Sequence, residues 1–266
     1  MSDPQTACYL YCLTPSGGGI QTAQMGVDGQ HPVFVRTCGE TGAVMGEVAM
    51  EEFCGEAAEE RLRDLAWLGP RVCRHAAVIE EVMRQAPVLP ARFATLYTTL
   101  DSLQRSVLDS QPAIAAFFAE LGDKQEWAVK GLLDRAAALE ELGAAGARGP
   151  AARSGARYLQ AKRIKAQLER DLNLRLREFC GRAAAALGAQ PGAFRERRIL
   201  PSASAGEDAE VVLNWAFLVA PAALDDFRFR LERLNDSAAF PGLRLTLSGA
   251  WPPYSFAPNL TGGSQA

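Results

Sequence analysis

Few side chains in this chain could bind a metal ion or move a proton near neutral pH. Imidazole suits both tasks because its ordinary pKa lies near 6.5, yet the sequence has only two histidines. His31 precedes Pro32 in a glycine-rich stretch, and we expect it to be solvated. His75 borders the apolar side of a helical pattern, and we expect it to have a structural role. We therefore expect no metal site built on histidine.

The acidic side chains also lack an arrangement suited to acid–base catalysis. Neighbouring pairs occur at residues 51–52, 59–60 and 80–81, within stretches of helical periodicity. Consecutive residues on a helix point in different directions, so the members of a pair do not face a common substrate. The sequence also lacks the motifs of phosphate-binding loops, dinucleotide sites, serine hydrolases and zinc proteases. We expect no enzymatic activity and no cofactor.

The composition predicts a folded protein of the cytoplasm. Apolar residues make up 48% of the chain and charged residues 22%, close to the averages of soluble globular proteins. No apolar run approaches the ~20 residues of a membrane span, and no signal-peptide pattern is visible. The net charge of -3 argues against general nucleic-acid binding. The six cysteines form no CxxC pair, and we expect them to be reduced and buried.

The most strongly charged element is a long helix predicted over 158–187, where apolar residues recur at steps of three and four. From Arg157 to Arg182, eight basic side chains outnumber three acidic ones. Two interpretations remain open: a solvated helix face, or a basic ridge that binds an acidic protein partner. Nucleic acid is a weaker third interpretation, because this face has no aromatic side chains on which bases could stack.

The first half of the chain predicts strands followed by helices. Alternating apolar residues predict strands at 8–13, 33–38 and 43–50, with a hairpin turn at 39–42. Helical periodicity predicts helices at 51–68 and 71–86, separated at Gly69 and Pro70. Two prolines favour an edge strand or an extended course for 87–97. Asp101 with Gln104 resembles a cap for the next helix, which Pro112 should kink or split and Gly122 should end.

The second half gives a more regular pattern. Strands are predicted at 126–133, 194–200, 210–219 and 243–247, the third of them covered on both faces. Helices are predicted at 158–187 and from Pro221 onward, after a weakly helical stretch that runs into a flexible linker within 136–156. Strand, helix, strand, strand, helix, strand is the order of a ferredoxin-like sheet. The long helix spans ~45 Å against ~27 Å for a strand, so its first half should overhang the sheet and pack on the first domain or on a partner.

These elements predict an α+β protein of two ferredoxin-like or variant α/β-sandwich domains. The first covers residues 1–123, the second covers 124–250, and an extended tail follows at 251–266. Prolines restrict this tail while it carries Trp251, Tyr254 and Phe256. Two placements remain open for the tail: it folds back to seal a groove of its own domain, or it docks into a neighbouring protein.

Five segments in this order resemble the gas vesicle protein F/L family (GvpF/GvpL). They are YLY at 9–11, PVLPARFAT at 87–95, EWAVK at 126–130, SGARYL at 154–159 and SGAWPPYSF at 248–256. Together they cover nearly the whole chain. Ala250 stands where the family pattern suggests proline, and Ala94 stands where glycine is common, so Ala94 should stiffen a turn.

The resemblance implies a protein of the cytoplasm and gas vesicle that assists vesicle assembly or forms a minor structural part. Its implied partners are the hydrophobic shell protein, gas vesicle protein A, and other gas vesicle accessory proteins. We expect partner binding, by hypothesis, at Pro90, Arg92, Phe93, Trp251, Pro253, Tyr254 and Phe256. The alternative is a ligand-binding or catalytic ferredoxin-like dimer, with a pocket lined by Trp127, Trp215 and Phe217.

Overall fold

The computed structural model describes residues 6–16, 19–146, 154–190, 192–199, 209–236, 240–260 and 264–265. The chain divides into two compact units. Unit 1 contains residues 1–125 and 250–266, and unit 2 contains residues 126–249. The expected boundary at 123/124 lies two residues earlier, and the expected tail belongs to unit 1.

The sheet of unit 1 is built around β1 (Thr6–Pro15), whose side chains are almost all buried. Its strand order is β10-β5-β1-β3-β2, and β4 also pairs with β1. All the pairings are antiparallel. The remaining strands are β2 (Val33–Cys38), β3 (Thr41–Ala49), β4 (Leu89–Pro90), β5 (Thr95–Tyr97) and β10 (Ser264–Gln265). The predicted strands at 8–13 and 33–38 are confirmed, and the strand at 43–50 is confirmed except for Met50, which begins a helix.

The hairpin between β2 and β3 has the predicted turn. Cys38 pairs with Thr41, which leaves Gly39 and Glu40 as the connecting residues. Gly39 has a φ of 62°, in the left-handed region that two-residue hairpin turns require and that glycine adopts at least cost.

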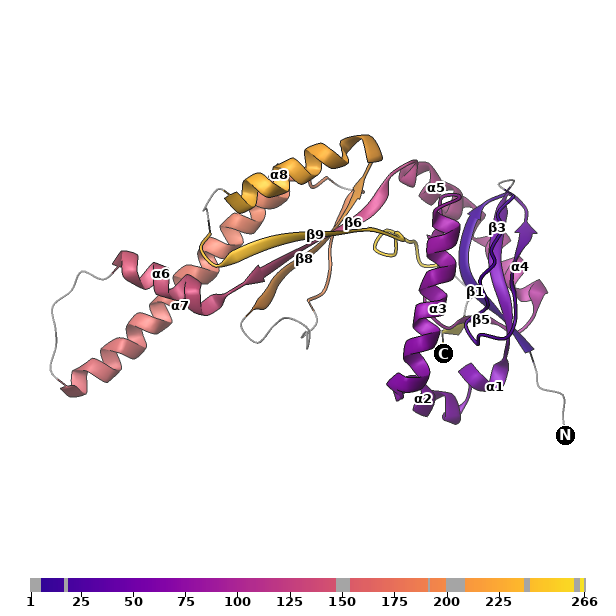
Figure 1. Cartoon of the computed structure of the whole chain (residues 1–266), viewed down its shortest axis with the longest axis horizontal. Helices are drawn as coiled ribbons and strands as arrows, with labels where there is room; N and C mark the ends of the chain where they lie inside the picture. The colour runs from indigo at the N-terminus through magenta and orange to yellow at the C-terminus, as the bar shows by residue number, and fades with distance from the viewer. Residues whose placement is uncertain are drawn as a thin grey trace. The chain divides into compact units, whose positions relative to one another are not determined.

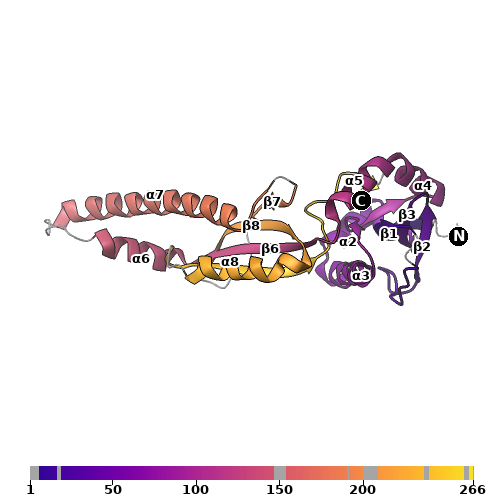
Figure 2. The ribbon, with the colours of Figure 1, turned by 90° about the horizontal axis from the view of Figure 1, so that it is seen from above.

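Helices cover both faces of this sheet (Figure 1). On one face lies α3 (Leu65–Met83), and on the other lie α4 (Leu100–Asp109) and α5 (Gln111–Leu121), an arrangement that the view from above repeats (Figure 2). The short helices α1 (Met50–Phe53) and α2 (Glu56–Arg63) precede α3. As predicted, a break at Ser110 precedes Pro112, and Gly122 ends α5.

The predicted division of the first helical region at Gly69 and Pro70 is wrong. The chain breaks earlier, at Gly55 with a φ of 87° and at Asp64, whose carboxylate caps α3 by accepting from the Ala66 N–H. Pro70 lies in the second turn of α3, and the helix continues through it. The predicted cap at Asp101 is also wrong. Thr99 caps α4 and forms a reciprocal pair with Ser102, because the helix begins one residue before Asp101.

Aromatic side chains fill the core between β1 and α3. Tyr9, Tyr11 and Phe53 are fully buried. The Tyr9 ring centroid lies 4.8 Å from that of Tyr11 and 5.5 Å from that of Phe53. Around them pack aliphatic residues of β1, β3 and α3, including Val44, Val78 and Ile79. This packing fixes α3 against the sheet.

Unit 2 has a four-stranded sheet in the order β7-β8-β6-β9. Its strands are β6 (Gln125–Leu133), β7 (Phe194–Glu196), β8 (Glu210–Val219) and β9 (Leu243–Trp251). The helices are α6 (Arg135–Gly146), α7 (Ser154–Ala186), the short 3-10 turn η1 (Pro221–Ala223) and α8 (Leu224–Asp236). This order of elements and strands is that of a split β-α-β sheet.

The predicted bounds of the elements in unit 2 agree in part with those observed. The predicted strand at 210–219 matches β8 in both bounds. Strand β7 stops at Glu196, short of the predicted residue 200, which lies outside the described residues. The first part of the expected linker, to Gly146, is helix α6. Residues 147–153, the rest of that linker before α7, also lie outside the described residues.

The first half of α7 has a neighbour in its own unit. Helix α6 crosses α7 in Figure 1 and lies next to it in Figure 2, and a Cβ placed on Gly143 of α6 would lie 3.6 Å from the Leu168 side chain of α7. Arg135 of α6 pairs with Glu169 of α7 at 3.0 Å. The prediction that this half packs on the first domain or on a partner overlooked α6.

The packing of unit 2 centres on β8. The Phe217 ring lies 5.1 Å from Phe227 of α8 and 5.0 Å from Phe194 of β7. Trp127 and Trp215 are buried. The side chains proposed to line a pocket in the ligand-binding alternative therefore pack in the core. Among the described residues, no helix is both long and apolar enough to cross a membrane.

Candidate functional site

The segment after β4 makes a tight turn over the edge of the sheet in unit 1. The Ala91 N–H donates to the Tyr11 carbonyl at 2.9 Å, and the Thr95 hydroxyl donates to the Arg92 carbonyl at 2.7 Å. Between them, Ala94 has a φ of 61° and is the one described non-glycine residue in the left-handed region. Strain is expected there, because the Cβ of an L-residue crowds the backbone in that region.

A buried hydrogen-bond chain holds this turn against α3. The Ala94 N–H donates to the Tyr9 hydroxyl at 3.0 Å, and that hydroxyl lies 3.0 Å from Nδ1 of His75. Nε2 of His75 lies 3.2 Å from the Ala91 carbonyl and 3.3 Å from the Tyr254 hydroxyl. Because the Ala91 carbonyl can only accept, we assign the proton to Nε2, and the Tyr9 hydroxyl donates to Nδ1.

Burial governs the ionisation of this chain. It lowers the pKa of His75 to about 4, although the hydrogen bond to the Ala91 carbonyl opposes the shift. Burial likewise raises the pKa values of Tyr9 and Tyr254 far above the ordinary range. All three groups are neutral near neutral pH, so the chain positions backbone and does not transfer charge. The structural role expected for His75 is confirmed.

A cavity of about 380 Å³ lies beside this chain, between the turn and the stretch from Tyr254 to Leu260. Its floor is formed by Leu10, Leu89 and Tyr97, all of them buried. At its rim, the Arg92 guanidinium donates to the Asn259 side-chain oxygen at 3.4 Å. The cavity therefore combines an apolar floor with polar groups at the rim.

The structure brings together part of the predicted partner-binding set. Pro90, Arg92 and Tyr254 line this cavity. Trp251 and Pro253 instead line a second cavity of about 240 Å³, with residues 83–88 and 121–125. Trp251 and Tyr254 remain 43% and 42% exposed, so both keep surface available.

The other two predicted residues, Phe93 and Phe256, line neither of these cavities. Phe93 packs against the aromatic core, edge-on to Tyr9 and His75 with ring centroids 6.2 and 5.7 Å apart. Phe256 is half-buried, and its N–H donates to the Pro253 carbonyl at 3.2 Å. Sequence reasoning missed Tyr9 and His75 as site-forming residues, because nothing in the local pattern ties them to position 254.

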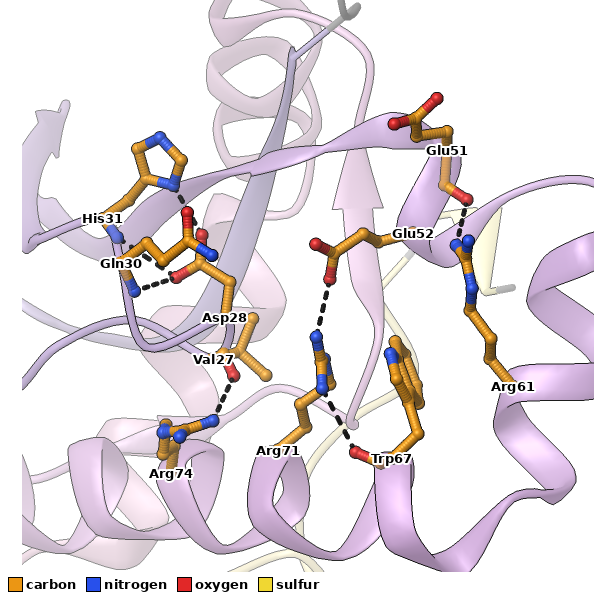
Figure 3. Close-up of polar contacts among 10 residues, drawn as sticks. All are labelled: Val27, Asp28, Gln30, His31, Glu51, Glu52, Arg61, Trp67, Arg71 and Arg74. Atoms are coloured by element: carbon orange, nitrogen blue, oxygen red, sulfur yellow. Dashed lines mark hydrogen bonds and ion pairs between the residues drawn. The ribbon is translucent and has the colours of Figure 1, made fainter.

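A second set of polar contacts in unit 1 surrounds α3 (Figure 3). The Asp28 carboxylate accepts from the Gln30 and His31 N–H groups at 2.9 and 3.1 Å and pairs with the His31 ring. Burial of Asp28 tends to raise its pKa, but these hydrogen bonds together hold that pKa below its usual value. The His31 side chain is 45% exposed, so the expectation that it is solvated is met only in part.

The nearby arginines are engaged inside the unit (Figure 3). Arg71 extends from α3 to pair with Glu52 at 3.0 Å and stacks on Trp67 at 4.1 Å from the ring centroid. Arg61 donates to the Glu51 carbonyl at 2.8 Å, and Arg74 to the Val27 carbonyl at 3.3 Å. These contacts join α1, α2 and the 27–31 loop to α3.

Groups suited to metal binding do not gather in the described part of the chain. Among those residues, no three His, Cys, Asp or Glu side chains are placed to hold a metal ion. All six cysteines are free, but only Cys12 and Cys38 are buried, whereas Cys73 is exposed. The expectation of uniformly buried cysteines is therefore wrong, since periodicity on α3 did not show which face Cys73 occupies.

Comparison with known proteins places the chain in a family. The family model described as gas vesicle synthesis protein GvpL/GvpF matches residues 7–258. Gas vesicle protein L of Streptomyces sp. (strain CB03234) is 32% identical over 253 residues, covering 94% of this chain and 92% of that protein.

Solved structures agree on the fold. The crystal structure of the gas vesicle protein GvpF from Anabaena sp. PCC7120 superposes with a TM-score of 0.67 at 18% identity, covering 97% of this chain and 98% of the other. GvpF from Microcystis aeruginosa gives a TM-score of 0.63 at 18% identity, covering 95% and 99%. The chain belongs to the gas vesicle synthesis protein GvpL/GvpF family.

Proposed function

We propose that this protein acts in gas vesicle formation as a non-catalytic accessory protein that binds the hydrophobic shell protein, gas vesicle protein A. It would do so in the cytoplasm and at the vesicle, together with other accessory proteins. The main observation in support of the proposal is the cavity lined by Pro90, Arg92 and Tyr254. Two segments more than 150 residues apart in the chain contribute to it.

The chemistry of the cavity suits a segment of an apolar protein. The buried floor of Leu10, Leu89 and Tyr97 offers apolar contact. The Arg92 guanidinium at the rim can donate to backbone carbonyls or to a carboxylate of the bound segment. A shell protein before polymerisation exposes apolar surface, which such a floor would cover.

Exposed aromatic residues extend this surface. Trp251 and Tyr254 are each more than two fifths exposed, and Pro252 and Pro253 between them are buried. The prolines hold the two aromatic rings on a stiff backbone, so little conformational entropy is lost on binding. Tyrosine and tryptophan are common anchors of protein interfaces.

Co-purification with the shell protein tests this proposal. We expect the tagged intact chain to retain the shell protein when the two are co-expressed, and Arg92→Ala and Trp251→Ala to reduce the retained amount several-fold. Arg36→Ala is the matched control, because Arg36 is an exposed arginine on β2 away from the cavity. Circular dichroism of each variant checks that the fold is intact.

A second experiment tests the role in the cell. Deletion of the gene should abolish or reduce vesicles, and the Arg92→Ala gene should restore fewer vesicles than the Arg36→Ala gene. Normal vesicles in the deletion strain, together with no shell protein retained by the intact chain, would contradict the proposal. Equal binding by Arg92→Ala, Trp251→Ala and Arg36→Ala would exclude this surface.

A further inference from the structure

Two helix faces, one in each unit, carry large apolar side chains that remain exposed. On α7, Leu174 is 58% exposed. On α3, Leu65 is 80% and Val72 is 40% exposed. Single exposed leucines are ordinary, but these lie among charges of opposite sign in the two units.

The face on α7 is basic. Arg163, Arg170, Leu174 and Arg177 follow one another at steps of seven, four and three, which places them on one side of the helix. We call these four residues the basic ridge, and all four are exposed.

Of the three acidic side chains near the basic ridge, two are already engaged, and the third, Glu178, is exposed. Glu169 pairs with Arg135 of α6 at 3.0 Å, and Asp171 accepts from the Gln167 amide at 2.8 Å. Within the described part of the chain, no ion pair joins an arginine of the basic ridge to a carboxylate. The ridge therefore presents positive charge around an apolar centre.

The face on α2 and α3 has the complementary chemistry. Leu65 and Val72 lie seven residues apart on one side of α3. Gly69 lies between them, and a Cβ placed there would meet nothing within 4 Å. Glu60 and Asp64, both exposed, precede Leu65. We call Glu60, Asp64, Leu65, Gly69 and Val72 the acidic face.

Basic side chains next to the acidic face are used within unit 1. Arg63 pairs with Glu59, and Arg71 pairs with Glu52 while stacking on Trp67. Arg61 donates to a backbone carbonyl. Glu60 is left to present its charge to an approaching protein.

The net charges of the two units are opposite and have the same signs as these two surfaces. Unit 1 contains 16 acidic and nine basic residues, and unit 2 contains 15 acidic and 19 basic residues. Opposite net charges on two parts of one chain favour contact between unlike parts of two copies and oppose contact between like parts.

We propose that the basic ridge of one copy docks on the acidic face of a second copy. Leu174 would pack over the open surface at Gly69 between Leu65 and Val72, with Arg170 or Arg177 next to Glu60. The contact joins different surfaces of the two copies, so it leaves one ridge and one face unused at the ends and can extend to further copies. This proposal concerns contact between copies and does not depend on shell-protein binding.

Sedimentation velocity of the intact chain tests it. We expect species larger than the monomer at low ionic strength and their dissociation at high salt, because exposed charge pairs are screened. Leu174→Asp and Leu65→Asp should each weaken association on the order of tenfold or more, because each places a negative charge in the apolar centre of the contact. Both residues are more than half exposed, so the thermal melting temperature should stay unchanged.

Leu108→Asp, on α4 at 52% exposure, is the matched control and should associate normally.

Mixing the two defective variants distinguishes this contact from a symmetric one. Leu65→Asp retains an intact ridge and Leu174→Asp retains an intact face, so an equimolar mixture should form a dimer that grows no further. A mixture that stays monomeric would overturn the proposal. It would also be overturned if the intact chain were monomeric at low salt, or if Leu65→Asp associated as well as the intact chain.

Discussion

The hydroxyl of Tyr254 lies 3.3 Å from Nε2 of His75, although 179 residues separate them in the chain. Through His75, Tyr254 is connected to the Tyr9 hydroxyl and to the turn that carries Arg92. The position of the cavity rim therefore depends on a buried chain of neutral groups.

The two tyrosines in this chain should differ in their contribution to stability. Tyr9→Phe leaves the Ala94 N–H and Nδ1 of His75 buried without a partner, and we expect the free energy of unfolding to fall by about 2–3 kcal/mol. Tyr254→Phe leaves Nε2 with the Ala91 carbonyl, so a loss below about 1.5 kcal/mol is expected. Urea unfolding measures both changes, and equal losses would contradict the assigned hydrogen bonds.

Protonation of His75 should destabilise unit 1. Its pKa falls from 6.5 to about 4 on folding, so the unfolded chain binds a proton before the folded chain does. The contribution of His75 to stability is full above pH 6.5 and is lost as the pH falls toward 4, by about 3 kcal/mol in all. Urea unfolding at several pH values, in a His31→Asn background to remove the other histidine, measures this slope. NMR of the His75 ring should show no titration near pH 6.5.

The contribution of His31 to stability should depend on pH in the opposite direction to that of His75. The hydrogen bond with Asp28 is the main cause that raises the pKa of His31 above 6.5, and burial opposes it. The contribution of His31 to stability is full below pH 6.5 and is lost as the pH rises through its raised pKa. NMR titration should place the His31 midpoint above 6.5 in the intact chain and lower in Asp28→Asn. An unchanged midpoint in that variant would show that Asp28 is not the cause.

Ala94→Gly should stabilise the protein. Ala94 has a φ of 61°, a conformation that costs an L-residue roughly 1–2 kcal/mol and glycine little. After allowing for the greater flexibility of glycine in the unfolded chain, we expect a gain of about 0.5–1 kcal/mol. Ala116→Gly, at an exposed position within α5, is the control and should instead lose about 1 kcal/mol. Urea unfolding measures the change in free energy for each variant, and thermal melting should show a higher midpoint for Ala94→Gly and a lower one for Ala116→Gly.

The pair of Glu126 and Arg197 in unit 2 should show strong coupling. Glu126 is fully buried, whereas the Arg197 side chain is 28% exposed. Arg197→Gln leaves the carboxylate buried without this partner, and we expect a loss of about 3 kcal/mol. The double variant Glu126→Gln with Arg197→Gln should recover part of that loss, because the buried charge is gone. A double-mutant cycle in urea measures the coupling, and additive losses would mean that the pair contributes nothing specific.

Local patterns predicted most of the elements. The bounds of β2 and β8 were predicted without error, because the hairpin turn ends β2 and because β8 is apolar on both of its faces. The helix boundaries around α3 were harder to predict from the sequence. Gly69 and Pro70 are strong breakers by type, but the cap at Asp64 sets an earlier helix start, and α3 continues through Pro70 although its nitrogen has no hydrogen to donate.

The candidate site was less predictable, because it depends on contacts distant in sequence. Pro90, Arg92 and Tyr254 could be proposed from their motifs, but nothing local indicated that they share a cavity. Phe93, adjacent to Arg92, packs against the core, because the turn between β4 and β5 directs the two side chains differently, and strand alternation does not apply within a turn. The one local sign was Ala94, where alanine stands in place of the glycine that the backbone favours.

The pairing of β10 with β5 has a consequence for synthesis on the ribosome. Residues 250–266 belong to unit 1 but are translated after all of unit 2. The sheet of unit 1 cannot gain its β10 strand, nor can His75 meet Tyr254, until unit 2 has emerged from the exit tunnel. During translation, the β5 edge and the cavity floor are therefore open to other chains, and a chaperone or an early partner would find them accessible in that interval.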